Sequence, residues 1–338
     1  MTTSSVLGYF TLMDVVNSYT SLDGNAQFLT AAQVLAKTKP FVRDMPLVES
    51  NQIMSNIGSR QTYLPTPGTR QFNSGVAISA VHTAPFNDPI AMVEDYSEVD
   101  LALWKIQNNP NAWRSEKDAM KVEKMGQKME DLLLYGSVAT DAGAFNGFLT
   151  RFNSLTRRPN GNTAWPYNVV SGGGSGGDTT SVVVVQWGPG KVYGIYPKNL
   201  PGGLQIEDLG QSTKNTNTEA SPRYLEVLRT HFSWYLGIVV EDERCIQRYA
   251  NIETSGAENI FNENTLITCL NNLPDRGAAP GTVIYASRSI CNQLDIAAKD
   301  KYNVKYEPDN VWGGMITKFR GIPVYLAEGI DETETVIT

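Results

Sequence analysis

The residues of this sequence that could perform chemistry fit no complete catalytic pattern. The glycine run at 171–177 contains Gly173-x-Ser175-x-Gly177, which matches a nucleophile elbow, and Gly172-x-Gly174-x-x-Gly177, which matches a dinucleotide-binding loop. Both motifs require a strand before the run and a helix after it. Here the run is followed by Asp-Thr-Thr-Ser and four valines, which favour a strand. We interpret both matches as accidents of low complexity.

Histidine and acidic residues give no better candidate. Only His82 and His231 occur, each within an expected strand, so a metal site made of several imidazoles is excluded. An acidic cluster could bind a divalent cation, but it spans an expected junction between a strand and a helix, which would point its carboxylates to different faces. Its members are Glu94, Asp95, Glu98 and Asp100. We expect solvated charge, and no metal site or cofactor.

The cysteines are odd in number and lack C-x-x-C spacing. They are Cys245, Cys269 and Cys291. Their apolar surroundings predict buried, reduced thiols. Because no nucleophile, base and oxyanion donor come together, the sequence does not predict an enzyme.

Composition limits the possible functions further. The 338 residues carry a net charge of −7, the wrong sign for a chain whose main role is to hold nucleic acid. Charged residues make up 19%, below the usual ~25%, and extensive self-association would explain the missing surface charge. No lysine or arginine precedes Lys37, so the charged start of a signal peptide is absent.

The N-terminal third predicts an arm followed by a long hairpin. Apolar residues at helical spacing indicate a short helix over 25–37, ended by Pro40. From Met45 to His82, short polar stretches, glycines and prolines lead into the alternation Val76, Ile78, Ala80, His82, which indicates two extended strands around a turn. This hairpin has few large apolar residues, so we expect it to project and to find its partner on a neighbouring molecule.

A strong helix is expected from about 115 to 135. Its apolar face contains Val122, Met125, Met129, Leu132 and Leu133. A second face carries four lysines at steps of four, three and four, namely Lys117, Lys121, Lys124 and Lys128. They could form a functional basic stripe, or a solvated face that Glu116, Glu123 and Glu130 partly neutralise.

The remainder predicts a β-rich stretch and then a small α/β unit. A buried strand at 182–185 is followed by a turn and a returning strand at 192–196, and after a polar excursion at 210–222 a strand with one apolar face covers 231–240. A helix starting near the caps Asn262 or Asn264, a strand at 282–286, a further helix and a closing strand at 322–326 complete the chain. The elements predict an α+β fold.

Several long segments resemble the major capsid proteins of tailed bacteriophages. The resemblance covers about residue 40 to the end. It is carried by GSRQTYLPTPGTRQFNSGV at 58–76, LLLYGS with FNGFLTRFN at 145–153, VVVVQWGPGKVYGIYPKNLPGGLQIEDLG at 182–210, YLEVLRTHFSWYLGIVVEDERCIQRYANI at 224–252 and FRGIPVYL at 319–326.

The resemblance implies the fold shared by tailed-phage capsids and encapsulins. Its parts would be an N-terminal arm (1–44), an extended loop with its base (45–97), a peripheral domain with a spine helix and the β-rich stretch (98–254), and an axial α/β domain with the C-terminal tail (255–338). In that family the peripheral strands commonly return at the C-terminus, whereas here the β-rich stretch precedes the α/β unit. A permuted topology is therefore possible.

The implied function is a structural shell protein of the virion. Identical copies would form hexamers and pentamers and close into an icosahedral head around double-stranded DNA, assembled in the cytoplasm of the host bacterium. The alternative within the same fold is an encapsulin-like compartment. From a different class, a small-molecule enzyme that uses the α/β unit as its ligand domain stays open.

The resemblance also implies partners and site residues. We expect a portal, cement or decoration proteins, and a separately encoded scaffolding protein, because only about 40 residues precede the extended loop. Some relatives join subunits covalently through a lysine on this loop, but no lysine lies between Lys39 and Lys105, so we expect no such cross-link. Arg60 and Arg70 would instead contact a neighbour's carboxylates. The spine helix would turn its four lysines toward non-specifically bound DNA in the lumen.

Overall fold

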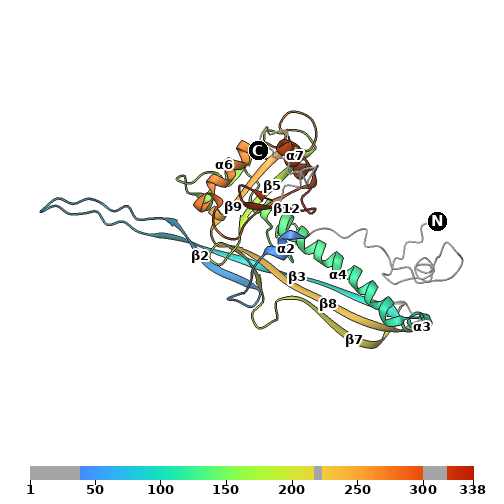
Figure 1. The fold of residues 1–338 in the computed structure, drawn as a ribbon. Helices are drawn as coiled ribbons and strands as arrows, with labels where there is room; N and C mark the ends of the chain where they lie inside the picture. Colours follow the sequence, from blue (N-terminus) through green and yellow to red (C-terminus); the bar gives the residue numbers. More distant parts are fainter. Residues whose placement is uncertain (1–38, 217–222, 300–317) are drawn as a thin grey trace. The chain divides into compact units, whose positions relative to one another are not determined.

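The computed structural model describes residues 39–216, 223–299 and 318–338, which fold into two six-stranded sheets with helices (Figure 1). The expected α+β class is confirmed. The first sheet has the strand order β1-β6-β8-β3-β2, with β7 also paired to β8. Its strands are β1 (Leu47–Glu49), β2 (Ser55–Tyr63), β3 (His82–Asp100), β6 (Val192–Tyr196), β7 (Gly203–Asn215) and β8 (Tyr224–Val240).

The second sheet has the strand order β11-β12-β10-β5-β9-β4. Its strands are β4 (Val169–Ser171), β5 (Thr179–Gln186), β9 (Ile246–Glu253), β10 (Thr282–Ala286), β11 (Lys318–Phe319) and β12 (Ile322–Leu326). The α-helices of the described ranges are α2 (Pro40–Asp44), α3 (Leu101–Ile106), α4 (Pro110–Tyr135), α5 (Phe148–Arg151), α6 (Glu263–Asn272) and α7 (Arg288–Lys299). None of them is long and apolar enough to cross a membrane.

The chain divides into two compact units. The first includes Met92–Lys128 and Gly203–Tyr235, and the second includes the described parts of Lys37–Ala91, Met129–Gly202 and Leu236–Thr338. Most of the expected N-terminal arm, with the helix predicted over 25–37, lies outside the described residues.

The second sheet forms the main core of the second unit. Alternate residues of β5, such as Val182 and Val184, pack in one cluster with Leu266 and Leu270 of α6 and with Ile290 of α7. The side chains between them on β5 are buried as well, so the strand is covered on both faces. This explains the unbroken run of valines in the sequence, since a strand that is buried on both faces does not alternate.

Aromatic side chains from α2 and α5 also pack in the second unit. Phe41 stacks on Tyr285 of β10 with ring centroids 3.8 Å apart, and it lies 5.7 Å from the ring of Phe148. The Trp187 indole donates a hydrogen bond of 2.7 Å to the Tyr285 hydroxyl. Burial therefore extends from β10 to the short helix α2, which lies just before the first sheet in the chain.

The predicted α/β unit is present and forms part of a larger layer. Strands β10 and β12 have the expected bounds and pair in parallel, and Asn262 caps α6 by accepting a hydrogen bond from the Asn264 amide. Strands β4, β5 and β9 complete the same sheet.

Two expectations for the β-rich stretch are wrong. Strand β6 does not return along β5, because it belongs to the first sheet, where it pairs with β8 and β1. The polar excursion at 210–222 contains the C-terminal part of β7, which pairs with β8 from Gly203↔Tyr235 to Asn215↔Tyr224. The strand was not predicted because its sequence is largely polar, and it is polar because most of its residues are exposed or half-buried.

In the first unit, α4 packs against strands of the first sheet. Trp113 of α4 is buried against Val99 of β3. Arg114 donates hydrogen bonds to the Asp208 carboxylate on β7 and, at 2.7 Å, to the Thr230 hydroxyl on β8. The hydrogen bonds from Arg114 hold the pKa of Asp208 below its ordinary value. The expected helix is confirmed, and it begins at Pro110, a residue well suited to a first helical turn.

Candidate assembly surfaces

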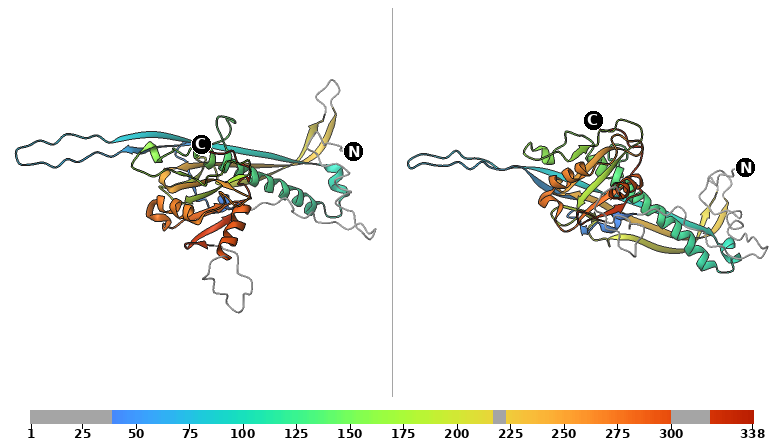
Figure 2. Two further views of the ribbon diagram at one scale, coloured as in Figure 1. Left: turned by 90° about the horizontal axis from the view of Figure 1, so that it is seen from above. Right: turned by 45° about the horizontal axis from the view of Figure 1, so that its top comes forward.

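The β2–β3 hairpin carries an exposed loop. The strands pair from Ser55↔Pro89 to Tyr63↔His82, and residues 64–81 continue beyond them as two extended arms (Figures 1 and 2). The loop is apolar in part, with the Phe72 side chain 98% exposed and the Ile78 side chain fully exposed. The expected hairpin is confirmed, but the alternation at 76–82 is not a regular strand: the returning strand begins at His82. Exposed apolar surface of this kind is typical of an interaction site.

The two arginines expected on this loop differ in position. Arg70 is exposed in the loop itself. Arg60 lies on β2, and its side chain is only 16% exposed. Its guanidinium donates to the Val240 carbonyl and the Glu243 carboxylate, and stacks 4.2 Å from the Phe86 ring. Burial lowers the pKa of Arg60, although Glu243 acts against this. A contact with a neighbouring copy stays a prediction for Arg70, whereas Arg60 is bound within its own chain.

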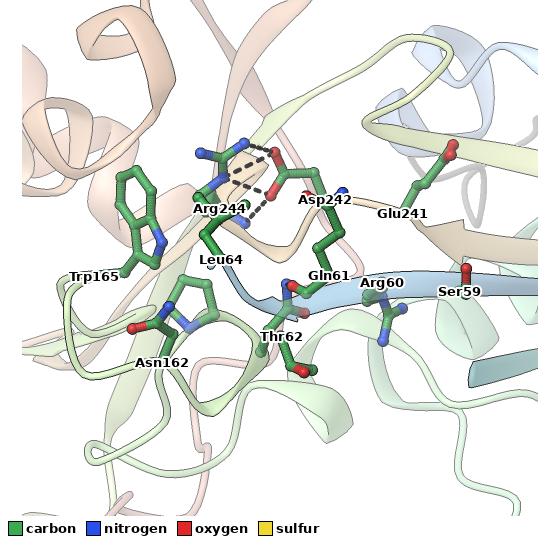
Figure 3. Close-up of a pocket in the computed structure, with 12 residues that line it drawn as sticks. Ser59, Arg60, Gln61, Thr62, Leu64, Asn162, Trp165, Glu241, Asp242 and Arg244 are labelled. Atoms are coloured by element: carbon green, nitrogen blue, oxygen red, sulfur yellow. Dashed lines mark hydrogen bonds and ion pairs between the residues drawn. The ribbon is translucent and has the colours of Figure 1, made fainter. Parts of the chain in front are cut away.

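A pocket of about 260 Å³ lies beside the base of the loop (Figure 3). Its lining includes Gln61 and Thr62 of β2 and the side chains of Trp165, Asp242 and Arg244. Arg244 forms a two-pronged ion pair with Asp242 and lies over the Trp165 ring at 4.7 Å. Because Arg244 and Asp242 neutralise each other, neither offers a free charge to the pocket. We therefore interpret it as a packing contact between segments and not as a reactive site.

The four lysines of α4 differ in how deeply they are buried. Lys117 is buried, and Lys121 donates hydrogen bonds of 2.9 Å to the Asp95 carboxylate and to the Tyr96 carbonyl. Of the four, only Lys124 and Lys128 are exposed. The helical spacing of the stripe is as expected, but neither a fully solvated face nor a stripe of four free ammonium groups describes it. Glu130, which we expected to neutralise the stripe from solvent, is 2% exposed.

The acidic cluster on β3 is divided between structural roles. Glu98 is paired with Lys214 and, at 2.6 Å, with Arg229. Burial alone would raise the pKa of Glu98, but Lys214 and Arg229 lower that pKa below its ordinary value. Asp95 pairs with Lys121, and Asp100 caps α3 by accepting from the Ala102 amide. The expected scattering of carboxylates is confirmed.

The remaining chemical candidates are not brought together in the described part of the chain. The glycine run leads into β5 and not into a helix, so it lacks the context that both of its motifs require. His82 and His231 belong to different units. Among the described residues, no group of three or more histidine, cysteine, aspartate or glutamate side chains is arranged to hold a metal ion. Burial raises the pKa of the Cys245 and Cys269 thiols to about 12, which leaves them unreactive.

Two clusters of functional interest could not be found from the sequence. Glu243 is a buried partner of Arg60 and Arg157, and Glu334 near the C-terminus is a buried partner of Arg248. The sequence suggests only a polar turn at 241–243. Each cluster joins residues more than 80 positions apart, and no local pattern encodes such a pairing.

Comparisons with known proteins agree with this geometry. A family model described as major capsid protein GP7 matches residues 23–338. A chain of the near-atomic cryo-EM structure of bacteriophage epsilon15 is similar, with 24% identity, a TM-score of 0.72 and 99% coverage of both chains. The capsid of bacteriophage JBD30 aligns with 12% identity and a TM-score of 0.50, covering 95% of this chain and 99% of that one.

An encapsulin from Synechococcus elongatus PCC 7942 aligns less well, with 13% identity and a TM-score of 0.40, covering 74% of this chain and 99% of that one. No curated protein matches the chain. The family model spans almost the whole sequence. The chain therefore belongs to the major capsid protein GP7 family and is a structural capsid protein.

Proposed function

We propose that copies of this chain form hexamers and pentamers that close into an icosahedral shell around double-stranded DNA. The loop at 64–81 carries the proposal, because every one of its residues is exposed and several are large and apolar. Contact with a neighbouring copy would remove this apolar surface from water at each position of the lattice. The low fraction of charged residues, 19%, fits faces that become buried on assembly.

The experiment is to purify the chain and examine it by sedimentation and negative-stain microscopy. The proposal predicts hexamers, pentamers or closed shells, formed alone or after a scaffolding protein is added. Shells that fill with a protein cargo and exclude DNA would instead indicate an encapsulin-like compartment. A dispersed monomer under all these conditions would contradict both.

Arg70 is the basic group of the loop that we infer to contact a neighbour's carboxylates. Each exposed pair contributes under ~1 kcal/mol, but the contact is repeated at every subunit. We expect Arg70→Glu to raise the protein concentration needed for assembly severalfold, while Arg70→Lys stays close to wild type. Light scattering against protein concentration measures the threshold. An unchanged threshold for Arg70→Glu would refute the role.

The basic stripe on α4 is proposed to face the lumen, as it would in shells of this fold. Packaged DNA carries one phosphate charge per ~1.7 Å of its axis, so weak contacts without base readout would offset repulsion from an acidic wall. Lys124 and Lys128, the exposed C-terminal half of the stripe, are the residues suited to this contact. Lys117 and Lys121, which lie in the first unit, would add their positive charge to the same face of the helix.

The double variant Lys124→Gln with Lys128→Gln tests this role while leaving Lys117 and Lys121 unchanged. Empty shells should keep their thermal stability, whereas full heads should lose DNA at a lower temperature. The difference should shrink as salt rises, because salt screens the contact. Replacing the exposed Lys105 and Lys198 by glutamine is the matched control. Equal DNA release from both double variants would count against a lumenal stripe.

The wider assembly follows the same proposal. We infer a portal, a separate scaffolding protein and cement or decoration proteins as partners, and assembly in the host cytoplasm. We assign residues 45–97 to the extended loop and its base, 98–254 to the peripheral domain and 255–338 to the axial domain. Pairing of β10 with β5 joins the axial assignment to the β-rich stretch in one sheet.

A further inference from the structure

Glu243 lies where the β2–β3 hairpin emerges from the second unit, and its carboxylate is bound from two other segments. One oxygen accepts from Arg157 at 2.9 Å and faces Arg60 at 3.4 Å. The other oxygen accepts from the backbone amide of Asn160 at 2.8 Å. The Glu243 side chain is 9% exposed. A carboxylate this deeply buried is stable in its charged form only while such partners remain in place.

Arg60 connects this carboxylate to both strands of the hairpin. Its Nε donates to the Val240 carbonyl at 3.1 Å, and its guanidinium lies on the ring of Phe86 from β3. Phe86 lies directly opposite Gly58 on β2, and a Cβ atom at Gly58 would come within 2.4 Å of that ring. The absence of a side chain at Gly58 therefore allows the ring to lie across the hairpin, where Arg60 packs on it.

These contacts end where the free loop begins. The last of them is a hydrogen bond of 3.3 Å from the Asn160 amide side chain to the Gln61 carbonyl. Every residue from Leu64 to Pro85 is exposed. Nine extended residues reach ~30 Å, so a tilt of ~10° at the base would displace the tip by ~5 Å. A displacement of that size would remove any specific contact at the tip.

We propose that Glu243, clamped between Arg60 and Arg157, is a positioning residue that fixes the direction in which the extended loop leaves the subunit. Arg60 holds the hairpin, Arg157 and Asn160 hold the segment after α5, and the carboxylate joins them. This inference rests on the proposed docking of the loop onto a neighbouring copy. It assigns to Glu243 the geometry of that docking and not the docking contact itself.

The direct test measures loop direction in the unassembled chain. Spin labels at Ser74→Cys in the loop and Thr268→Cys on α6 report a distance within the second unit, in a Cys291→Ser background because Cys291 is half-buried and the other two cysteines are buried. We expect a narrow distance distribution in the parent and at least a twofold broader one in Glu243→Gln. An unchanged width in Glu243→Gln would overturn the proposal.

Matched variants separate positioning from general damage. Glu241→Gln changes an exposed carboxylate of the same turn and should leave the distribution unchanged. Glu243→Asp keeps the charge and should restore part of the narrow distribution. If Glu243→Gln does not fold, Arg157→Gln replaces it, since Arg157 is 36% exposed and its loss leaves the hairpin core intact. Arg157→Gln must then broaden the distribution, and a parental width would overturn the proposal.

Assembly gives the second readout. At equal folded concentration, Glu243→Gln should lower the yield of closed shells at least tenfold relative to Glu241→Gln and should increase open or irregular products. Equal yields would overturn the link to assembly. If the parent chain forms no shells, the proposed function fails, while the distance measurement still decides whether Glu243 directs the loop.

Discussion

Replacing Glu334 by alanine is expected to destabilise the unassembled chain by about 3–5 kcal/mol, the cost of removing one partner of a buried ion pair. Glu334 accepts a hydrogen bond of 2.8 Å from Arg248, and the two side chains are 6% and 5% exposed. Its carboxylate also accepts from the Tyr135 hydroxyl at 2.7 Å and from the Ser181 hydroxyl. The substitution leaves the Arg248 charge buried without a counterion, and denaturant unfolding followed by circular dichroism measures the loss.

We expect the loss of stability to depend on which acidic residue of the C-terminal segment is replaced. Glu332, two residues earlier, is exposed and accepts hydrogen bonds from the Ser289 amide and hydroxyl, so Glu332→Ala should cost only about 1 kcal/mol. Replacing both Arg248 and Glu334 by methionine should cost less than the sum of the single changes, because no unpaired charge then remains. A loss below ~1 kcal/mol for Glu334→Ala would show that the C-terminal segment is not anchored by this pair.

Replacing Glu130 by glutamine is expected to stabilise the chain at neutral and alkaline pH. Both carboxylate oxygens are buried and have no hydrogen-bond partner among the described residues. Burial raises the pKa of Glu130 to about 8. The positive charge of Lys39 lowers this pKa, whereas the negative charges of Asp131 and Asp44 raise it further. A carboxyl group whose pKa is raised on folding binds a proton in the folded state that the unfolded state has lost.

The pH dependence of stability therefore has a definite sign. Folding stability should fall as pH rises from about 4.5 to about 8, the ordinary and folded pKa values of Glu130, by at most ~5 kcal/mol for a shift of this size. Glu130→Gln should match wild type near pH 4 and exceed it by several kcal/mol at pH 8. Unfolding curves at a series of pH values measure this, with Glu116→Gln as the control on the same helix. Parallel curves for Glu130→Gln and wild type would contradict it.

Local patterns predicted those elements whose burial follows from their own residues. The bounds of β10 and β12 and the cap of α6 were predicted because short apolar runs and a capping asparagine specify them locally. The long helix α4 followed from its apolar periodicity. The extended loop was predicted because the hairpin has few large apolar residues and so cannot bury much surface against its own domain.

Long-range pairing accounts for what the sequence did not reveal. Nothing local distinguishes β6 as a partner of β8 from a strand that returns along β5, and β7 is polar because most of its residues are exposed or half-buried. The same holds for single side chains. The spacing of the α4 lysines was correct, but their exposure depends on partners such as Asp95, which the helix does not contain. Glu243 looked like part of a polar turn because its partners are distant in sequence.

The central claim is that this chain forms the shell of a phage head, with each extended loop lying on a neighbouring copy. Cryo-EM of particles assembled from the full chain tests it most directly. The account predicts closed icosahedral shells in which residues 64–81 of every subunit contact the adjacent subunit and bury Phe72. Particles in which the loop stays in solvent or folds back on its own subunit, or a chain that remains dispersed even with its scaffolding protein, would contradict it.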